Sequence, residues 1–255
     1  MHSILSRRPG APPYGSDSLL ARMRLSILMP VYNERERVER AIEEVLGCEL
    51  PVDVELIVVD DGSVDGTREL LRDHDWGERV RLYEHDVNQG KGAAVRTALG
   101  HARGELSAVF DADLEYDPAD LALLLPPLLD GKTNASFGVR AFDGYTSHSF
   151  LYVLGNKGVT LACNVLFNVY LRDIMTCQKV IRTELFRSLP LHAAGFAIEP
   201  EITARLLQRG ERIYEVPVSY RARLTEEGKK LTARDGFRVL AMLVRCRLTA
   251  DRARR

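Results

Sequence analysis

The feature that most limits the fold of this chain is a regular alternation, from residue 25 onward, of short apolar runs with segments of helical periodicity. The apolar runs, which we expect to be strands, occupy residues 25–30, 54–59, 79–84, 106–110 and 135–139. Segments with helical spacing lie between them, at 38–46, after residue 65, at 90–102 and at 119–129. This alternation predicts an α/β fold with a mostly parallel, Rossmann-like sheet flanked by helices. Ligands of such sheets bind beyond the carboxyl ends of the strands, so the loops after the strands are where chemistry is expected.

The second half of the chain is less regular. We expect a long helix at 154–171, a strand at 178–182, a helix at 199–209, a strand at 213–218 and a terminal helix at 235–248. The terminal helix mixes apolar residues with Arg238, Arg245 and Arg247. That pattern is typical of a helix on an anionic membrane surface, and equally of one that packs on the core and continues into a solvated tail. Polar residues interrupt the stretch 150–171, so no membrane-spanning helix is expected there.

Charge and cysteine content exclude some classes of partner. The 35 Lys and Arg residues balance 36 Asp and Glu residues, so no overall field draws the chain to nucleic acid, and any anion must be held locally. The four cysteines lie far apart, without the spacing of a zinc site or a disulfide framework. We therefore expect a protein of a reducing compartment, in the cytoplasm.

The segment with the clearest chemistry is 109–113, where an apolar strand runs into Asp111 and Asp113. Strand alternation places these two side chains on one face, and two carboxylates about 4 Å apart repel by about 4 kcal/mol at an effective dielectric of 20. A cation is therefore expected between them, and a divalent ion with oxygen ligands would let a diphosphate bind beside acidic residues. The alternative is an Asp-rich turn that caps a helix starting at Pro118, for which Asp117 alone would suffice.

Three other loops follow expected strands. Residues 30–34 (PVYNE) offer the ring of Tyr32 for stacking on a base. Asp60 and Asp61 end another strand, and we expect one of them to face the cleft and bind a nucleobase or ribose while the other braces the loop. Alone, that segment is only a good turn and helix cap. Residues 88–92 (NQGKG) combine close backbone approach, a helix N-terminus and the cation Lys91, a combination that suits an anion.

Four motifs occur in one order: PVYNE, VVDDGSVDGT, NQGKGAA and FDADLEYDP. Together they resemble family 2 glycosyltransferases of the type A fold, especially the branch of polyprenyl-phosphate (dolichyl-phosphate) mannose and glucose synthases. The resemblance runs from about residue 25 to 248 and includes GFAIEPEI and EVPVSYRARLTEEGKKLTARDG. It implies a glycosyltransferase catalytic domain at 24–233. From composition alone we expect residues 1–23, rich in Arg, Pro and Gly, to be a flexible extension, and 234–255 to be an amphipathic helix with a basic tail. Met23, just before the first strand, is an alternative start.

The resemblance also implies a role for individual residues. Those expected to contact the nucleoside are Pro30, Tyr32, Glu34, Val59 and Asp61. The rest of the donor site is expected to comprise Lys91, Asp111, Ala112 and Asp113. Asp111 and Asp113 would hold Mg²⁺ or Mn²⁺, and Glu115, where relatives often have Gln, would be a further metal ligand. The residues expected to bind the acceptor phosphate are Arg140, Arg223, Lys229 and Lys230, and those expected to be catalytic are Asp113, Arg140 and Arg223.

The implied activity is metal-dependent, inverting transfer of a hexose from a nucleoside-diphosphate sugar to a polyprenyl or dolichyl phosphate at the cytoplasmic face of a membrane. The donor would be GDP-mannose or UDP-glucose. Because an acceptor phosphate is already anionic, the enzyme needs alignment and charge neutralisation rather than a base. One departure concerns the acceptor: near residues 146–149, where relatives commonly have further basic residues, this chain offers only His148.

Other functions remain open at this point. Transfer to a hydroxyl of a soluble or glycan acceptor would need a base, for which Glu199 or Glu201 is the candidate, although each is also an ordinary acid at a helix start. An apolar strand ending in Asp-x-Asp also occurs in phosphatases that use an aspartyl nucleophile. A nucleotide-sugar-binding protein without turnover is a further alternative.

Overall fold

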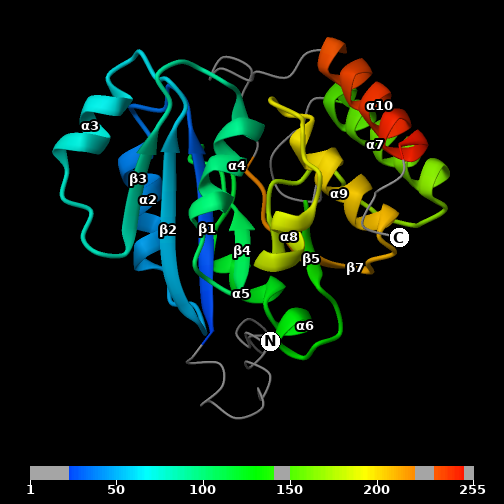
Figure 1. Cartoon of the computed structure of the whole chain (residues 1–255), viewed down its shortest axis with the longest axis horizontal. Coiled ribbons are helices and arrows are strands. Elements are labelled where there is room, and N and C mark those ends of the chain that lie inside the picture. Colours follow the sequence, from blue (N-terminus) through cyan, green and yellow to red (C-terminus); the bar gives the residue numbers. More distant parts are fainter. Residues whose placement is uncertain (1–22, 141–149, 222–232, 250–255) are drawn as a thin grey trace, which may run out of the picture.

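The computed structural model describes residues 23–140, 150–221 and 233–249. In these residues one seven-stranded sheet runs in the order β3-β2-β1-β4-β6-β5-β7 (Figure 1). Its strands are β1 (Arg24–Val31), β2 (Asp53–Asp60), β3 (Val80–Glu84), β4 (Leu106–Val109), β5 (Ala135–Arg140), β6 (Lys179–Arg182) and β7 (Ile213–Val218). Each expected strand is present, with ends that shift by two residues at most.

The sheet is mostly parallel, as the alternation predicted. β1 pairs in parallel with β2 and β4, β2 with β3, and β5 with β7, whereas β6 is antiparallel to both β4 and β5. The chain builds β2 and β3 on one side of β1 and then returns to add β4 on the other side. The crevice beyond the carboxyl ends of β1 and β4 is therefore a topological switch point, where ligands of open α/β sheets bind.

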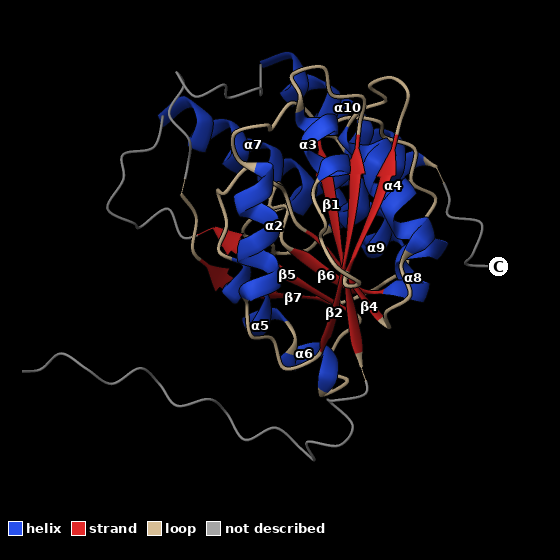
Figure 2. Ribbon diagram, turned by 90° about the vertical axis from the view of Figure 1, so that its left-hand side faces the viewer, coloured by secondary structure: helices blue, strands red, loops and turns tan. Residues whose placement is uncertain are grey.

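Helices cover both faces of the sheet (Figure 2). Strand alternation separates two cores: Ile27 and Val58 belong to one with α2 (Val38–Gly47), α3 (Thr67–Asp73), α5 (Leu121–Leu124) and α6 (Pro126–Leu129). Leu28 and Ile57 belong to the other with α4 (Lys91–His101), α8 (Thr183–Ser188) and α9 (Ile198–Gln208). Burying both faces of the central strands explains why these strands read as unbroken apolar runs.

A third apolar cluster lies at the β7 side of the molecule, where α7 (Phe150–Phe167) and α10 (Ala233–Leu248) pack against α9 (Figure 1). Val239, Leu243 and Cys246 are the buried residues of α10 in this cluster. The terminal helix thus packs on the core through one side. Among the described residues, none of the helices combines the length and the apolar character needed to cross a membrane.

The helices differ from expectation in three places, and one of them is α7, which lies four residues earlier than the helix expected at 154–171. The single helix expected at 119–129 is a 3₁₀ turn (Pro118–Asp120) followed by the short helices α5 and α6. Pro126 and Pro127 explain the break, because proline lacks an amide donor and is tolerated only in the first turn of a helix. The short helix α8 follows β6 directly and was not expected, since six residues are too few to show a helical period.

Candidate active site

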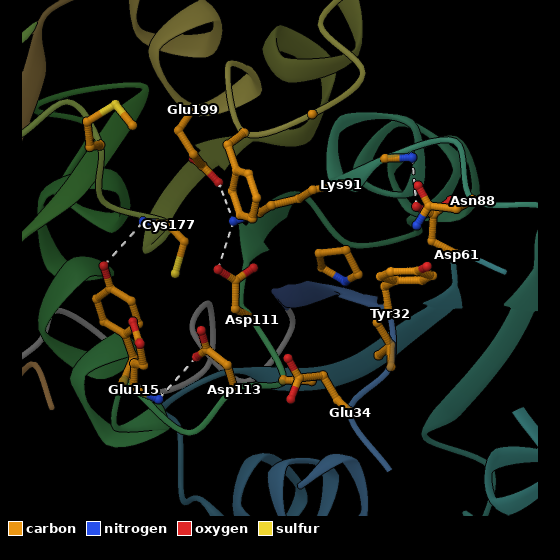
Figure 3. Close-up of a pocket in the computed structure, with 18 of the residues that line it drawn as sticks. Tyr32, Glu34, Asp61, Asn88, Lys91, Asp111, Asp113, Glu115, Cys177 and Glu199 are labelled. Carbon is orange, nitrogen blue, oxygen red and sulfur yellow. Dashed lines mark hydrogen bonds and ion pairs between the residues drawn. The ribbon is translucent and has the colours of Figure 1, made fainter. Parts of the chain in front are cut away.

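A cavity of about 350 Å³ lies beyond the carboxyl ends of β1 and β4 (Figure 3). The sequence-predicted residues that line it are Pro30, Tyr32, Glu34, Asp61, Lys91, Asp111, Ala112, Asp113, Glu115, Arg140 and Glu199. The structure thus brings together residues of four strand-end loops that the sequence separates widely. Arg223, Lys229, Lys230 and His148 lie outside the described residues.

The loop after β1 is attached to the loop after β2. Asn33, which has a positive φ of 53°, accepts a hydrogen bond from the Val64 amide (2.9 Å), and its own amide donates to the Ser63 hydroxyl (2.9 Å). Asn tolerates this left-handed backbone better than most residues. The Glu34 amide adds a bond to the Thr67 hydroxyl. These bonds fix the turn that carries Tyr32 and Glu34 to the cavity wall.

Asp60 and Asp61 divide their roles largely as the sequence predicted. Asp60 is fully buried and braces its loop by accepting from the Ser63 amide and from Arg68 (2.8 Å). Asp61 lines the cavity but is only 2% exposed. Its carboxylate pairs with His85 (2.7 Å) and accepts the amides of residues 89 and 90. Most of the hydrogen bonds that Asp61 accepts therefore hold the loop before α4 in place.

Val59, which we expected to contact a nucleoside, does not turn its side chain into the cavity. Val59 is fully buried and packs in the core with Val95 of α4. The strand alternation that turns this side chain toward α4 removes it from the cavity.

The glycine-rich loop 88–92 serves packing rather than anion binding. The amides of Gly92 and Ala93, in the first turn of α4, donate to the Ala194 carbonyl. A Cβ atom on Gly92 would lie 2.1 Å from the Ala193 oxygen, so the close approach requires glycine. We expected the backbone amides at this helix N-terminus to bind an anion. The amides of Gly92 and Ala93 instead bind a carbonyl of another loop, so they are not available to a ligand. Asn88, Gly90 and Lys91 of this loop line the cavity, and Lys91 is the cation among them.

Asp111 and Asp113 come together through a turn rather than through strand alternation. β4 ends at Val109, and the next residues turn back, with Leu114 at a positive φ of 61°. The Glu115 amide donates to Asp113 (3.1 Å), which fixes the turn. Both carboxylates point into the same cavity (Figure 3). Asp117 caps the following 3₁₀ turn by accepting the Ala119 amide, so the cap is a separate feature that leaves the Asp pair for other chemistry.

A row of alternating charges extends from Asp111 into the interior. The Lys91 ammonium lies 2.8 Å from Asp111 and 2.9 Å from Glu199 (Figure 3). The other Glu199 oxygen lies 2.7 Å from the buried Lys179. Burial lowers the pKa of Lys91, but the two carboxylates outweigh it and hold this pKa well above its usual value. For Lys179 burial prevails and lowers the pKa. The row neutralises Asp111 with a cation of the protein itself.

The two glutamates considered as bases are engaged elsewhere. Burial raises the pKa of Glu199, but Lys179 and Lys91 outweigh it, so the pKa lies below its usual value and the carboxylate is a weak base. Glu201 does not line the cavity. Its carboxylate accepts the amides of His192 (2.9 Å) and Ala193 (2.7 Å) and so supports the loop that packs on α4. The expectation of a base at Glu201 was wrong, and Glu199 is poorly suited to that role.

Arg140 lines the cavity as a paired cation. Its guanidinium forms two hydrogen bonds to the Asp173 carboxylate, at 2.6 and 2.9 Å, and both side chains are almost fully buried. The guanidinium also lies 5.1 Å from the centre of the Tyr220 ring. An acceptor phosphate at this point would share Arg140 with Asp173.

The cavity contains residues that the sequence analysis did not single out, chiefly Tyr116, Met175, Cys177, Phe196 and Tyr220. Met175 and Cys177 precede β6, whose antiparallel direction no local pattern revealed. Burial, followed by the nearby charge of Asp111, raises the pKa of Cys177 well above its usual value, so the thiol stays neutral. Tyr116, Phe196 and Tyr220 were inside quoted motifs, and for Tyr220 the aromatic ring after a strand was the available signal.

The carboxylates fit a particular kind of metal site. Among the described residues there is no group of three His, Cys, Asp or Glu side chains that could hold an ion. The carboxylate of Glu115, which we expected to be a further metal ligand, accepts the Tyr220 hydroxyl (2.7 Å). Mg²⁺ is commonly held by one or two carboxylates together with substrate phosphates. Asp111 and Asp113 fit an ion whose coordination a diphosphate completes.

A model of the family described as glycosyl transferase family 2 matches residues 26–189. The chain belongs to glycosyltransferase family 2. This assignment excludes the aspartyl-nucleophile phosphatase considered for the Asp-x-Asp segment. It also accounts for the joint occurrence of the four strand-end motifs.

Curated relatives of this family 2 chain include enzymes named for polyprenyl phosphates. Glycosyltransferase AglJ of Haloferax volcanii is 31% identical over 196 residues, which are 76% of this chain and 62% of AglJ. The dolichol-phosphate mannosyltransferase of Pyrococcus furiosus is 26% identical, covering 81% of this chain and 59% of the relative. The dodecaprenyl-phosphate galacturonate synthase of Rhizobium johnstonii is 28% identical, covering 83% of this chain and 63% of the relative. The chain thus spans about three fifths of the length of these relatives.

Solved structures confirm the fold of the family 2 chain. The glucosyl-3-phosphoglycerate synthase of Mycobacterium tuberculosis, in complex with phosphoglyceric acid, superposes with a TM-score of 0.71. It is 22% identical and covers 95% of this chain and 88% of its own. The same enzyme has been crystallised with Mn²⁺ and UDP. The α/β arrangement is therefore the type A glycosyltransferase fold.

Proposed function

We propose that this chain transfers a hexose from a nucleoside-diphosphate sugar to a polyprenyl phosphate, with inversion at the anomeric carbon. The observation that carries the donor half is the single cavity that gathers Tyr32, Asp111 and Asp113 at the switch point of the sheet. An aromatic ring suits a nucleobase, and the two carboxylates suit a metal-bound diphosphate. The names of two curated relatives, a dolichol-phosphate mannosyltransferase and a dodecaprenyl-phosphate galacturonate synthase, support a hexose-type sugar and a lipid phosphate acceptor. The donor that we propose is GDP-mannose or UDP-glucose.

Asp111 and Asp113 would hold Mg²⁺ or Mn²⁺. When bound, the ion would supply positive charge to the leaving diphosphate. Tyr32, Pro30 and Glu34 would position the nucleoside along the loop that the Asn33 and Ser63 bonds hold in place. Lys91 would contribute a second positive charge on the α4 side.

The engagement of both candidate bases supports an acceptor that needs none. Glu199 lies between two lysines, and Glu201 supports a neighbouring loop. A phosphate monoester is anionic at neutral pH, so alignment and electrostatic neutralisation suffice for its attack on the anomeric carbon. Transfer to a hydroxyl would need a carboxylate with a higher proton affinity than Glu199 has.

On the acceptor side we assign Arg140, with Arg223, Lys229 and Lys230 from the segment outside the described residues. Arg140 is the described cation of this group that lines the cavity. Its pairing with Asp173 fixes the orientation of the guanidinium, and the Asp173 carboxylate offsets the positive charge of Arg140. The charge of a phosphate acceptor would therefore be met mainly by the other three cations.

Contact with a lipid surface at the cytoplasmic face of a membrane is part of this proposal. α7 and α10 pack side by side (Figure 1). They expose apolar side chains, among them Leu161, Val165, Phe237 and Leu248. The exposed Arg245 lies in the last turn of α10. Exposed apolar residues beside basic ones are typical of helices that bind anionic membranes. A lipid acceptor would be presented at such a surface.

A product assay tests the proposal. The full chain is incubated with a panel of GDP- and UDP-sugars, Mn²⁺ and a short polyprenyl phosphate, and products are identified by mass. We expect a polyprenyl-phosphate hexose and free nucleoside diphosphate, both absent in EDTA. Transfer to phosphoglyceric acid or to a sugar hydroxyl instead would show that the acceptor is not a polyprenyl phosphate. Binding of sugar nucleotide without any turnover across the panel would favour the non-catalytic alternative.

A further inference from the structure

Lys91 contacts the same carboxylate that we assign to the divalent ion. Its ammonium lies 2.8 Å from Oδ2 of Asp111, and the side chain is only 12% exposed. An ammonium and a divalent ion that share one carboxylate repel each other in a partly buried site, where screening by solvent is weak. Binding of the ion to Asp111 therefore has to displace the positive charge of Lys91 or overcome it.

The structure provides a second partner for Lys91. Its ammonium already lies 2.9 Å from Oε1 of Glu199, whose other oxygen is held by Lys179. Glu199 is almost fully buried and anchored, so it can retain Lys91 when Asp111 binds another cation. The backbone at Lys91 is fixed by the contacts of Gly90 and Gly92 with Ala194, so the adjustment belongs to the side chain.

We propose that Lys91 is an internal competitor of the divalent ion for Asp111, and that this competition makes metal and sugar nucleotide bind interdependently. Without a nucleotide, the ion has to displace Lys91 and affinity is low. A diphosphate brings negative charge that both cations can share, so its binding raises the affinity for the ion. By thermodynamic reciprocity the ion raises the affinity for the nucleotide by the same factor. The inference rests on the metal dependence proposed above and adds a mechanism for the order of binding.

The test is calorimetric titration of the full chain with Mn²⁺ alone, and again with saturating UDP or GDP. We compare the wild type with Lys91→Met and Lys91→Gln, which leave Glu199 paired with Lys179. The control is Lys132→Met, which removes a surface lysine paired with Asp130. Circular dichroism and thermal melting establish that each variant is folded. Met and Gln differ in polarity, so we expect at least one of the two Lys91 variants to fold. One folded variant is sufficient for the comparison.

We expect both Lys91 variants to bind Mn²⁺ alone at least tenfold more tightly than the wild type. The factor by which the nucleotide raises Mn²⁺ affinity should be smaller in these variants by a similar amount, while the part that comes from direct phosphate ligation should remain. Lys132→Met should behave as the wild type. Unchanged or weaker Mn²⁺ binding in folded Lys91 variants, with nucleotide-dependent Mn²⁺ binding in the wild type, would overturn the inference and leave the proposed metal site intact. Absence of Mn²⁺ binding to every protein, even with nucleotide, would overturn both.

Discussion

In the proposed function, Asp113 is the residue on which metal-dependent donor binding would depend most directly. It lines the cavity beside Asp111, and its backbone turn is fixed by the Glu115 amide. We predict that Asp113→Asn abolishes the metal-dependent part of nucleotide binding, because the amide removes a charged ligand while keeping the shape of the turn. Calorimetry with UDP and GDP, in Mn²⁺ and in EDTA, measures the effect.

The matched control for this substitution is Asp117→Asn. Asn caps helices about as well as Asp, so this variant should keep both the cap and the affinity. Wild-type affinity in folded Asp113→Asn would show that the ion is held elsewhere.

Glu55 illustrates a carboxylate with a structural role. Burial raises its pKa, but bonds from Ser26, from the Arg103 amide and from Arg81 outweigh it and lower the pKa below its ordinary value of 4.5. The charged form is therefore favoured in the folded state, and its stabilisation is complete above pH 4.5 and lost as pH falls through the folded pKa. We predict that Glu55→Gln lowers the free energy of unfolding at pH 7 by about 2 kcal/mol.

Urea denaturation between pH 3 and pH 7 checks this prediction. The difference between wild type and variant should stay constant from pH 7 to about pH 5.5 and narrow below pH 4.5, as the wild-type carboxyl gains its proton. Glu43→Gln, on the exposed side of α2, should show no such difference. A gap that widens on acidification would contradict the assignment.

The residues of the site were predictable from sequence where the signal was local. An apolar strand that runs into Asp111 and Asp113 is visible as a pattern within eight residues of the sequence. The pairing of Lys91 with Glu199 joins residues far apart in the chain, and no spacing rule reveals it. The burial of the Val59 side chain against α4 was likewise not readable from the sequence, because the side to which a strand-end side chain turns depends on which helix packs there.

At the scale of elements, the junction of α4 with the loop before α9 sets one wall of the cavity. We predict that Gly92→Ala destabilises the protein by about 1–3 kcal/mol, because its Cβ would lie 2.1 Å from the Ala193 oxygen. The loop that would be displaced contains Phe196 and leads to Glu199, and both residues line the cavity, so affinity for nucleotide should fall as well. Thermal or urea denaturation and calorimetry measure the two effects.

Gly100 of the same helix is the matched control. A Cβ there meets nothing within 4 Å. Gly100→Ala should therefore stabilise the protein by up to about 1 kcal/mol through helix propensity and leave nucleotide binding unchanged. Equal effects of the two substitutions would show that the α4 junction does not shape the cavity.

Most elements were predictable because buried parallel strands read as apolar runs and the helices between them keep their period. The direction of β6 was not, since an antiparallel strand of four residues has the same local pattern as a parallel one. The broken helix at 118–129 was within reach, because Pro126 and Pro127 stand in the sequence. Applying the proline rule there would have ended the first helix at Leu125.

At the scale of the whole molecule, α7 and α10 form the side that we expect to meet a membrane. We predict that Phe237→Ser, Leu248→Ser and Leu161→Ser each weaken binding to anionic vesicles by about tenfold, because each removes an exposed apolar side chain from the contact. Co-sedimentation of the full chain with phosphatidylglycerol-containing vesicles measures this. Leu123→Ser, on α5, should bind as the wild type.

Equal binding by all four variants would contradict a lipid contact through α7 and α10. Loss of self-association in the three variants, without any change in vesicle binding, would assign this side to a second copy of the chain instead.

The central claim is that Asp111 and Asp113 seat the diphosphate of a sugar nucleotide through a divalent ion in this cavity. The most direct test is a crystal structure of the chain with Mn²⁺ and a sugar nucleotide. The account predicts the ion on both carboxylates, the diphosphate on the ion, and the base beside Tyr32. A ligand bound outside the cavity, with both aspartates directed away from the ion, would contradict it.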